Sequence, residues 1–271
     1  MTGDRPDPAL LDRVLRFYVN CARVDLDGRR RVVEYLEVYG VPAAAGVADR
    51  HDLVWTTPGT WDVAYRKLKK MKGAAAVAGR RLLAMWRYKG NQVPSTLGFD
   101  GVLIPIAAGG RLVSAKVYRP PQEVDGKARR GKFCLRGMTT RYLWGADDVP
   151  AARRIYVVEG EGDKIALDGY FMTHWSAPAP AVVATGGIAV VADAERCETI
   201  RSWRRAGKRV FIMSDPKEHE RRAAADLAAA TGAQVYFSDV DPRDLVGRMT
   251  AKEAASKPPH SGVLSPVTPA V

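Results

Sequence analysis

Three acidic residues and two glycines directly follow an apolar run in the sequence RRIYVVEGEGDKIAL, which covers residues 153–167. The run IYVV is typical of a buried strand, and the IAL that follows the acids is typical of a helix packed on a core. Glu159 is therefore predicted to stand at the exit of a strand. Gly160 and Gly162 are expected to let the backbone turn tightly into the helix.

Acidic side chains also follow two later apolar runs. Asp215 follows VFIMS, whereas Asp241 and Asp244 follow VYFSDV. At the remaining run, VVA, the residues that follow include Gly186 and Gly187. Ligands of open α/β sheets bind beyond the carboxyl ends of the strands, and carboxylates that meet there repel one another unless a cation lies between them. Carboxylate oxygens suit Mg²⁺ or Mn²⁺, so the pattern predicts a metal site at this sheet edge.

The same acids also have a purely structural interpretation. Carboxylates near helix N-termini cap free N–H groups and interact favourably with the helix dipole, which by itself accounts for Asp163. Glu161 is explained equally well as a solvated surface residue. For Glu159 and Asp215 together, at the ends of two apolar strands, we favour the metal-site interpretation over capping.

Alternating apolar and amphipathic segments after residue 153 predict the elements that position these acids. Their order is β-α-β-α-β-α-β, which is typical of an α/β fold with a mostly parallel sheet flanked by helices. Upstream, residues 8–40 are predicted to be helical with a stop at Gly40, and residues 60–90 form a basic helical zone. Residues 98–119 predict a hairpin around a Gly-Gly pair. The basic zone fits either a solvated helix face or a surface that faces nucleic acid.

Composition and charge limit the class of protein and its partners. The chain has 271 residues and a formal net charge of +12, which favours a polyanionic partner such as nucleic acid. Its three cysteines include no C-x-x-C pair, so no zinc ribbon is expected. The N-terminus lacks the apolar core of a signal peptide, and no run approaches a membrane span of about 20 apolar residues. We therefore expect a cytoplasmic protein with no membrane partner.

The patterns predict two domains and a tail. A basic, mixed α+β subdomain of helices and a hairpin is expected over residues 1–150, and an α/β domain over residues 151–250. Residues 251–271 are rich in Pro, Ser and Ala, so they are expected to form a disordered tail.

Four motifs within residues 153–247 resemble the Toprim domain, which DnaG-type primases, type IA and type II topoisomerases and some nucleases share. They are VVEGEGDKIAL, VVATGGIA, VFIMSDP and DVDPRDLV. The upstream order GFDGVLIPIAAGGRLVSAKVYRP, GKFCLRGMTTRYLWG and RRIYVVEGEGD is similar to that of DnaG-type primases, and topoisomerases and Toprim nucleases lack it. The segment VVEYLEVYGVP also resembles the helix that opens the primase core. The chain is therefore similar to a primase catalytic core.

The resemblance implies a DNA primase, which copies single-stranded DNA into a short RNA primer from NTPs with Mg²⁺ or Mn²⁺. It implies that Glu159 and Asp215 hold the metal ions, that Glu159 accepts a proton, and that Asp163 and Asp244 support them. Lys132 matches the lysine of the family's basic segment, so it would bind the triphosphate or the template. The other nucleotide- or nucleic-acid-binding residues implied are Lys116, Arg119, Arg141, Gly186 and Gly187.

One position departs from the family pattern. The family's second acidic motif is Asp-x-Asp, whereas this chain has the sequence DPK at 215–217, so Lys217 replaces the second aspartate. Glu218 or Glu220 could substitute for it, and His219 could join them. Alternatively, the Lys217 ammonium could take the place of a second cation. The departure leaves one-metal and inactive versions of the site open.

The chain also contains no zinc-binding module, helicase domain or G-x-x-x-x-G-K-[ST] motif. Such a stripped core resembles those of bacteriophages and plasmids, and it implies a separate replicative helicase as partner. Two alternatives share the expected fold. The first is a Toprim nuclease, and the second is a catalytically degenerate accessory protein that binds nucleic acid.

Overall fold

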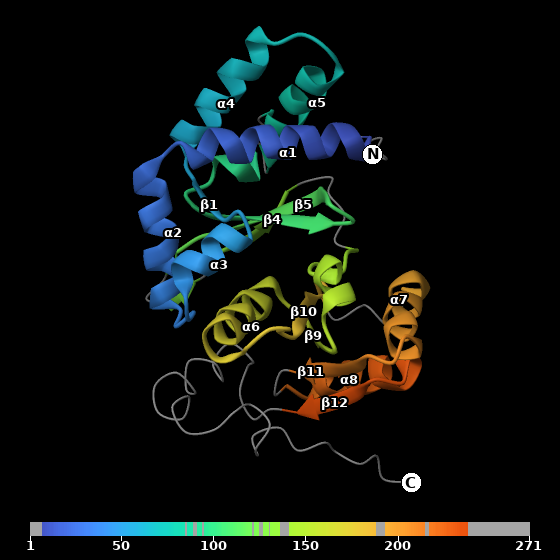
Figure 1. Cartoon of the computed structure of the whole chain (residues 1–271). Coiled ribbons are helices and arrows are strands. Elements are labelled where there is room, and N and C mark those ends of the chain that lie inside the picture. Colours follow the sequence, from blue (N-terminus) through green and yellow to red (C-terminus); the bar gives the residue numbers. More distant parts are fainter. Residues whose placement is uncertain are drawn as a thin grey trace. The chain divides into compact units, whose positions relative to one another are not determined.

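Two compact units make up the chain (Figure 1). They are Met1–Tyr35 with Ala48–Thr139, and Leu36–Val47 with Thr140–Val271. The computed structural model describes residues 7–84, 95–120, 131–135, 141–187, 193–214 and 217–236, and the backbone alone of 86–88, 91–93, 122–124, 127–129 and 237. The sequence predicted a boundary at residue 150, whereas the units meet between Thr139 and Thr140, and a short upstream segment joins the second unit. The expected tail, 251–271, lies outside the described residues.

Helices dominate the N-terminal part, as the sequence predicted. Asp7 caps the first helix by accepting a hydrogen bond from the backbone N–H of Ala9 at 2.7 Å, and Pro8 occupies the first turn. The predicted helical region 8–40 is divided in two, and Gly40 lies just beyond its end with a φ of 68°. The helices are α1 (Pro8–Arg23), α2 (Leu26–Val38), α3 (Ala44–Arg50), α4 (Pro58–Lys70) and α5 (Ala74–Leu83).

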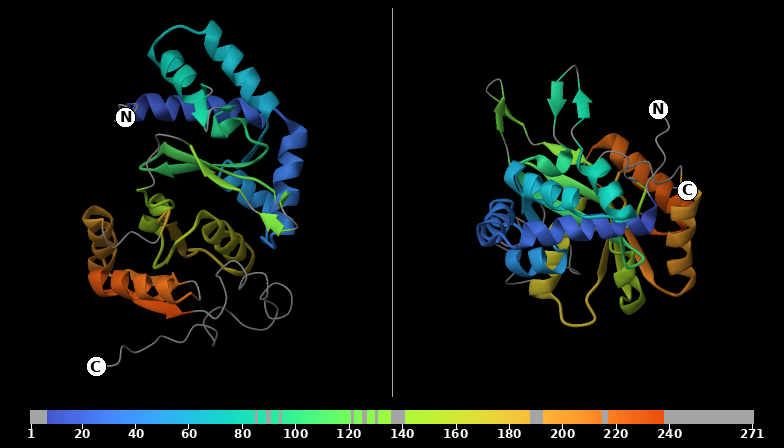
Figure 2. Two further views of the ribbon diagram at one scale, coloured as in Figure 1. Left: turned by 180° about the vertical axis from the view of Figure 1, so that it is seen from behind. Right: turned by 90° about the horizontal axis from the view of Figure 1, so that it is seen from above.

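The basic helical zone is shorter than the prediction of residues 60–90. Its last helix ends at Leu83, and residues 86–88 form a strand that pairs with residues 91–93. Trp86 and Tyr88 favour strands, so residue type outweighed the apparent helical period here. The two antiparallel ribbons of the first unit, visible in Figure 2, are β2 (Trp86–Tyr88) with β3 (Asn91–Val93), and β6 (Gln122–Val124) with β7 (Lys127–Arg129).

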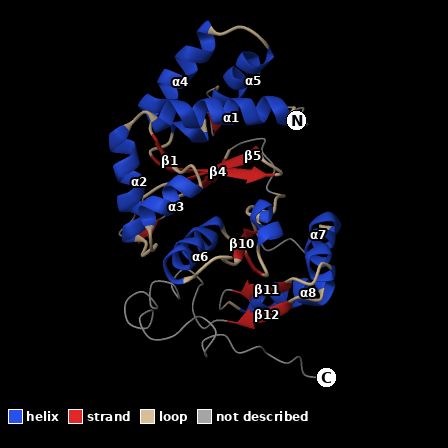
Figure 3. Ribbon diagram, viewed as in Figure 1, coloured by secondary structure: helices blue, strands red, loops and turns tan. Residues whose placement is uncertain are grey.

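A four-stranded antiparallel sheet forms the centre of the first unit. Its order is β1-β4-β5-β8, with β1 (Val54–Thr56), β4 (Gly101–Ala108), β5 (Arg111–Tyr118) and β8 (Lys132–Cys134); the 3₁₀ turn η1 (Thr96–Gly98) precedes β4. The predicted hairpin is confirmed, because Gly109 and Gly110 join β4 to β5 with φ of 59° and 70°. Helix α1 packs on this sheet with α4 and α5 beyond it (Figure 3). Within this core Tyr18 is fully buried and donates to the Leu97 carbonyl.

The second unit is the α/β domain that the sequence predicted. Its sheet is parallel, in the order β10-β9-β11-β12, and helices connect the strands. Because both faces are covered, its two central strands are almost continuously apolar. The elements are η2 (Ala146–Ala151), β9 (Arg154–Val158), α6 (Glu161–His174), β10 (Ala181–Ala184), α7 (Ala194–Arg205), β11 (Arg209–Ser214), α8 (Glu218–Thr231) and β12 (Gln234–Phe237).

Alternate residues of the strands face opposite helical layers. On one face, Val157 and Ile212 are buried in a core with residues of α7 and α8. On the other face, the rings of Tyr156 and of Phe171 in α6 have centroids 5.3 Å apart. Among the described residues, helices therefore cover both faces of this sheet.

The segment Leu36–Val47 belongs to the second unit because it packs on α6. A Cβ atom on Gly169 would lie 2.3 Å from the carbonyl oxygen of Pro42, so only glycine fits at this contact. No helix within the part of the chain that the structure describes is long and apolar enough to cross a membrane.

Candidate active site at the carboxyl edge of the parallel sheet

The strand register brings the end of β11 beside the end of β9. Ile212 is paired with Val157, so Ser214 lies level with Glu159 at the carboxyl edge. On the other side of β9, Thr185 follows the end of β10, and its backbone N–H donates to the Val158 carbonyl at 3.0 Å. The expected convergence of strand ends is thus present in the described part of this edge.

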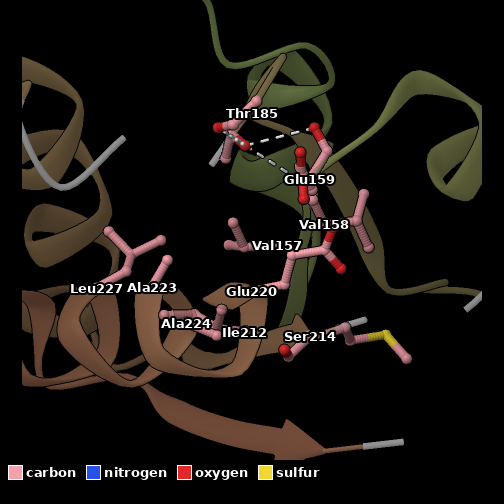
Figure 4. A pocket seen from close by; sticks show the side chains of 12 residues that line it. Val157, Val158, Glu159, Thr185, Ile212, Ser214, Glu220, Ala223, Ala224 and Leu227 are labelled. Carbon is pink, nitrogen blue, oxygen red and sulfur yellow. Dashed lines mark hydrogen bonds between the residues drawn. The ribbon is translucent and has the colours of Figure 1, made fainter. Parts of the chain in front are cut away.

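A pocket opens at this edge, between the strand ends and one side of α8 (Figure 4). Residues at the ends of β9, β10 and β11 form one wall, and the first three turns of α8 form the other. Figure 4 shows Glu220 extending from α8 toward the end of β9, where Glu159 stands. The lining residues are Val157, Val158, Glu159, Thr185, Gly187, Ile212, Met213, Ser214, Glu220, Ala223, Ala224 and Leu227.

Thr185 holds the loop that forms one rim of the pocket. Its hydroxyl lies 3.3 Å from the Val158 carbonyl and 3.1 Å from the Gly187 carbonyl. Gly186 and Gly187 adopt φ of 75° and 150°, which residues with a side chain rarely adopt. The sequence indicated the two glycines but not Thr185, whose buried position depends on the neighbouring strand.

Two side chains of α7 fix the same loop from the other side. Asp193 caps α7 by accepting a hydrogen bond from the backbone N–H of Arg196 at 3.2 Å. That bond and the Arg196 guanidinium, 3.1 Å away, hold the pKa of Asp193 below its ordinary value. The guanidinium also donates to the Thr185 carbonyl at 2.7 Å, so it connects α7 to the pocket rim.

Glu220 is a nearly buried acidic residue that lines the pocket. Its side chain is 10% exposed, and the Lys217 ammonium lies 2.8 Å from its Oε1 atom. The other oxygen, Oε2, is buried and has no hydrogen-bond partner among the described residues. A buried carboxylate oxygen without a donor is costly, and a hard cation is the ligand that would satisfy it.

Glu161 was expected to be solvated, and the structure shows this to be wrong. Its side chain is fully buried at the start of α6, where the Tyr142 hydroxyl donates to Oε1. Asp163 accepts a hydrogen bond from the Gly160 N–H at 3.1 Å, so it closes the first turn of α6 as the capping interpretation predicted. Gly160 is the N-cap of α6 with an extended φ of −108°, so the chain turns from β9 into α6 within two residues without the left-handed backbone that favours glycine.

The segment before β9 is fixed to the sheet by a buried lysine. Trp144 forms an antiparallel bridge with Ala184, and the Lys164 ammonium lies 5.2 Å from the Trp144 ring centroid. That ammonium also donates to Asp168 at 2.7 Å and to the Val182 carbonyl at 2.8 Å. A Cβ atom on Gly145 would lie 2.3 Å from this carbonyl, so glycine is required where the segment crosses β10.

The basic residues predicted to bind substrate have different environments. In the first unit, Lys116 is only 2% exposed on β5, whereas Lys132 is exposed with its ammonium 5.3 Å from the Tyr118 ring centroid. Arg119 is half-buried against Phe99, and its Nε atom has no hydrogen-bond partner among the described residues. In the second unit, the exposed Arg141 guanidinium lies 3.9 Å from Asp193.

The remaining predicted metal ligands lie outside the described residues. These are Asp215, Asp244 and the neighbouring Asp241. Within the described ranges, no group of three or more His, Cys, Asp or Glu residues is arranged to hold a metal ion. The described part of the edge nevertheless fits a hard divalent cation, since Glu159 and Glu220 line one pocket and Glu220 has an unsatisfied oxygen.

The fold has known counterparts among solved structures, although no protein-family model and no curated protein sequence matches the chain. A DNA primase domain from Pseudomonas aeruginosa matches 81% of this chain and 67% of its own, with a TM-score of 0.53 and 22% identity. A DnaG catalytic core matches 86% of this chain and 75% of its own, with a TM-score of 0.52 and 19% identity.

A third counterpart is the RNA polymerase domain of the Mycobacterium tuberculosis primase DnaG, solved in complex with double-stranded DNA. It matches 92% of this chain and 79% of its own, with a TM-score of 0.58 and 18% identity. The three matches establish the fold of the chain, which the sequence motifs had indicated.

Proposed function

We propose that this chain, which has the fold of a DnaG-type primase catalytic core, is a DNA primase. It would synthesise short RNA primers on single-stranded DNA by metal-dependent nucleotidyl transfer, in the cytoplasm of a bacterial host and in phage or plasmid replication. The observation that carries the proposal is a pair of carboxylates, Glu159 and Glu220, in a pocket at the carboxyl edge of the parallel sheet of that fold.

The Toprim motifs assign the metal-holding role to Glu159 and Asp215, with Asp163 and Asp244 in support. A bound Mg²⁺ or Mn²⁺ would lower the pKa of the attacking 3′-hydroxyl and neutralise charge on the phosphates. Glu159 stands directly after a buried strand, so its position is fixed by the sheet, and it is also the proposed proton acceptor. Asp163 acts through α6, because its carboxylate closes the first turn of that helix.

Binding of the substrates is assigned to basic side chains and to the glycine loop. Lys132 and Arg141 are exposed and suited to phosphate groups, whereas Lys116 is buried and would reach a ligand only after a local change. The buried Nε atom of Arg119 has no hydrogen-bond partner within the described ranges, and a phosphate oxygen would satisfy it. Gly186 and Gly187 would let backbone amides approach a phosphate closely. NTPs, a single-stranded template and a separate replicative helicase are the proposed partners.

Primer synthesis on mixed-sequence single-stranded DNA, with labelled NTPs and Mn²⁺, tests the proposal. The wild type should make short labelled products, and Glu159→Gln should abolish them while leaving thermal unfolding unchanged. Glu195→Gln is the matched control, because Glu195 is an exposed acid on α7 and lies outside the pocket.

Two other outcomes would replace the proposal with an alternative. Shortening of labelled DNA without added NTPs, lost in Glu159→Gln, would identify a nuclease. Salt-sensitive DNA binding that Glu159→Gln leaves intact, with no product and no uptake of Mn²⁺, would identify a non-catalytic accessory protein.

A further inference from the structure

We propose that Glu220, on α8, is the carboxylate that completes the divalent-cation site in place of the missing second aspartate, and that Lys217 occupies its Oε1 atom until the cation binds. The inference rests on the proposed function, because it concerns the same pocket. It assigns roles to Glu220 and to Lys217, and Lys217 stands where the family motif has its second Asp.

Helical geometry separates Glu220 from the other acid of the first turn of α8. Glu220, Ala223, Ala224 and Leu227 follow the i, i+3, i+4, i+7 pattern of one helix face, and all four line the pocket. Glu218 is two residues from Glu220, about 200° around the helix axis, and it is exposed. The structure thus distinguishes between two glutamates that the sequence left equivalent.

The two oxygens of Glu220 have different environments. Oε1 accepts a hydrogen bond from the Lys217 ammonium at 2.8 Å, and the His219 ring lies 3.6 Å from the same atom. Oε2 is buried, has no hydrogen-bond partner among the described residues, and belongs to a side chain that is only 10% exposed. A charged group is seldom left so incompletely satisfied in an interior, which indicates that a ligand completes it.

The surroundings of Glu220 favour a cation over a neutral donor. Glu159 lines the same pocket from the end of β9, so a cation there would have carboxylates on two sides (Figure 4). Ala223 and Ala224 line the pocket with single methyl groups, so they leave room for a ligand beside Glu220. Oxygen ligands from two rigid elements are typical of sites for Mg²⁺ and Mn²⁺.

Lys217 explains how the acid is tolerated before a cation arrives. Its side chain is 61% exposed, so the ammonium can leave Oε1 for solvent at little cost. Lys217 is therefore a counter-ion of Glu220 that competes with the metal ion for the Oε1 atom. It is a positioning residue, because it acts on the metal only through Glu220.

Titration with Mn²⁺ alone, without NTPs or template and followed by the electron paramagnetic resonance signal of free Mn²⁺, tests the inference. We expect Glu220→Gln to weaken binding by at least about tenfold and Glu218→Gln to leave it unchanged. Lys217→Ala should strengthen binding about two- to fivefold, because it removes the competing ammonium. Equal affinity of Glu220→Gln and wild type, or no binding of Mn²⁺ by the wild type, would overturn the inference.

Loss of folded protein would not obscure the result. Thermal unfolding of each variant identifies a folding defect, and Lys217→Ala tests the same contact from an exposed side chain. An affinity that falls or stays unchanged in a folded Lys217→Ala protein would contradict the competing role. A Glu220-dependent Mn²⁺ site in a protein that makes no primers would support the inference while rejecting the proposed function, so the two failures are distinguishable.

Discussion

The Lys164 ammonium lies 2.7 Å from Asp168 Oδ2 in the interior of the second unit, where the two side chains are 0% and 4% exposed. The pair stands one helical turn apart on α6, and the ammonium also donates to the Val182 carbonyl of β10. It therefore connects α6, the edge strand β10 and the Trp144 segment, and Trp144 bridges Ala184, which pairs with Val158 at the carboxyl end of the strand before Glu159.

Breaking this pair should be among the most destabilising changes in the chain. Lys164→Met leaves the Asp168 carboxylate buried without its cation, and we expect a loss of about 3–5 kcal/mol in the free energy of unfolding. The double variant Lys164→Met with Asp168→Leu should lose less, because no charge remains buried. Urea unfolding of the single and double variants measures this, and an additive double variant would contradict the expected coupling.

The hydrogen bond between Tyr142 and Glu161 should contribute more than an ordinary one. Its acceptor is a fully buried carboxylate, so Tyr142→Phe should lower the free energy of unfolding by about 1.5–3 kcal/mol. In a Glu161→Gln background the same change should cost less, because the acceptor is neutral. Chemical unfolding of all four proteins completes the cycle, and equal costs in both backgrounds would argue against a charged acceptor.

Gly169 should tolerate no side chain. The Cβ atom of Gly169→Ala would lie 2.3 Å from the Pro42 carbonyl oxygen, so we expect a loss of at least about 1–3 kcal/mol from overpacking. Gly59→Ala is the control, because its nearest contact would be 3.5 Å and alanine favours a helix by up to about 1 kcal/mol. If the two variants showed the same thermal midpoint, the close packing of Leu36–Val47 on α6 would be refuted.

The Asp193 cap should contribute stability that depends on pH. Its pKa is lowered in the folded protein, so the contribution is present above the ordinary value of about 3.9 and is lost as the pH falls through the folded pKa. Asp193→Ala should therefore cost about 1 kcal/mol at pH 7. The difference between the urea midpoints of variant and wild type, measured from pH 7 to pH 3, should become smaller below about pH 4, and a constant difference would exclude the carboxylate as its source.

Lys132 should contribute to binding of single-stranded DNA through a phosphate contact. Lys132→Ala should reduce the slope of log affinity against log salt concentration by about 1, because one fewer counter-ion is released. Arg111→Ala is the control, since Arg111 is an exposed cation at the start of β5, next to the turn of the β4–β5 hairpin. Fluorescence anisotropy at several salt concentrations gives both slopes, and equal slopes for Lys132→Ala and wild type would rule out the contact.

Local patterns were sufficient for the order of elements in the second unit, and for the first helices and the β4–β5 hairpin of the chain, but not for the strand at residues 86–88. The apolar run before Glu159 and the Gly109–Gly110 turn depend on neighbouring residues, so periodicity and turn chemistry predicted a strand and a hairpin correctly. The motifs also indicated the primase-core fold that the solved structures match. The sequence by itself therefore determined the order of elements in the second unit, the fold and the edge of the sheet where Glu159 stands.

Only the tertiary structure decided which acidic side chains are buried and which groups they contact. Glu161 and Glu220 are both acids in the first turn of a helix. The first is fully buried and accepts a hydrogen bond from Tyr142, whereas the second lines a pocket and has one oxygen without a hydrogen-bond partner among the described residues. These differences arise from residues distant in sequence that come together only when strands pair and helices pack. Because a side chain's environment depends on such neighbours, local sequence could name Glu220 as a candidate but could not distinguish it from Glu218.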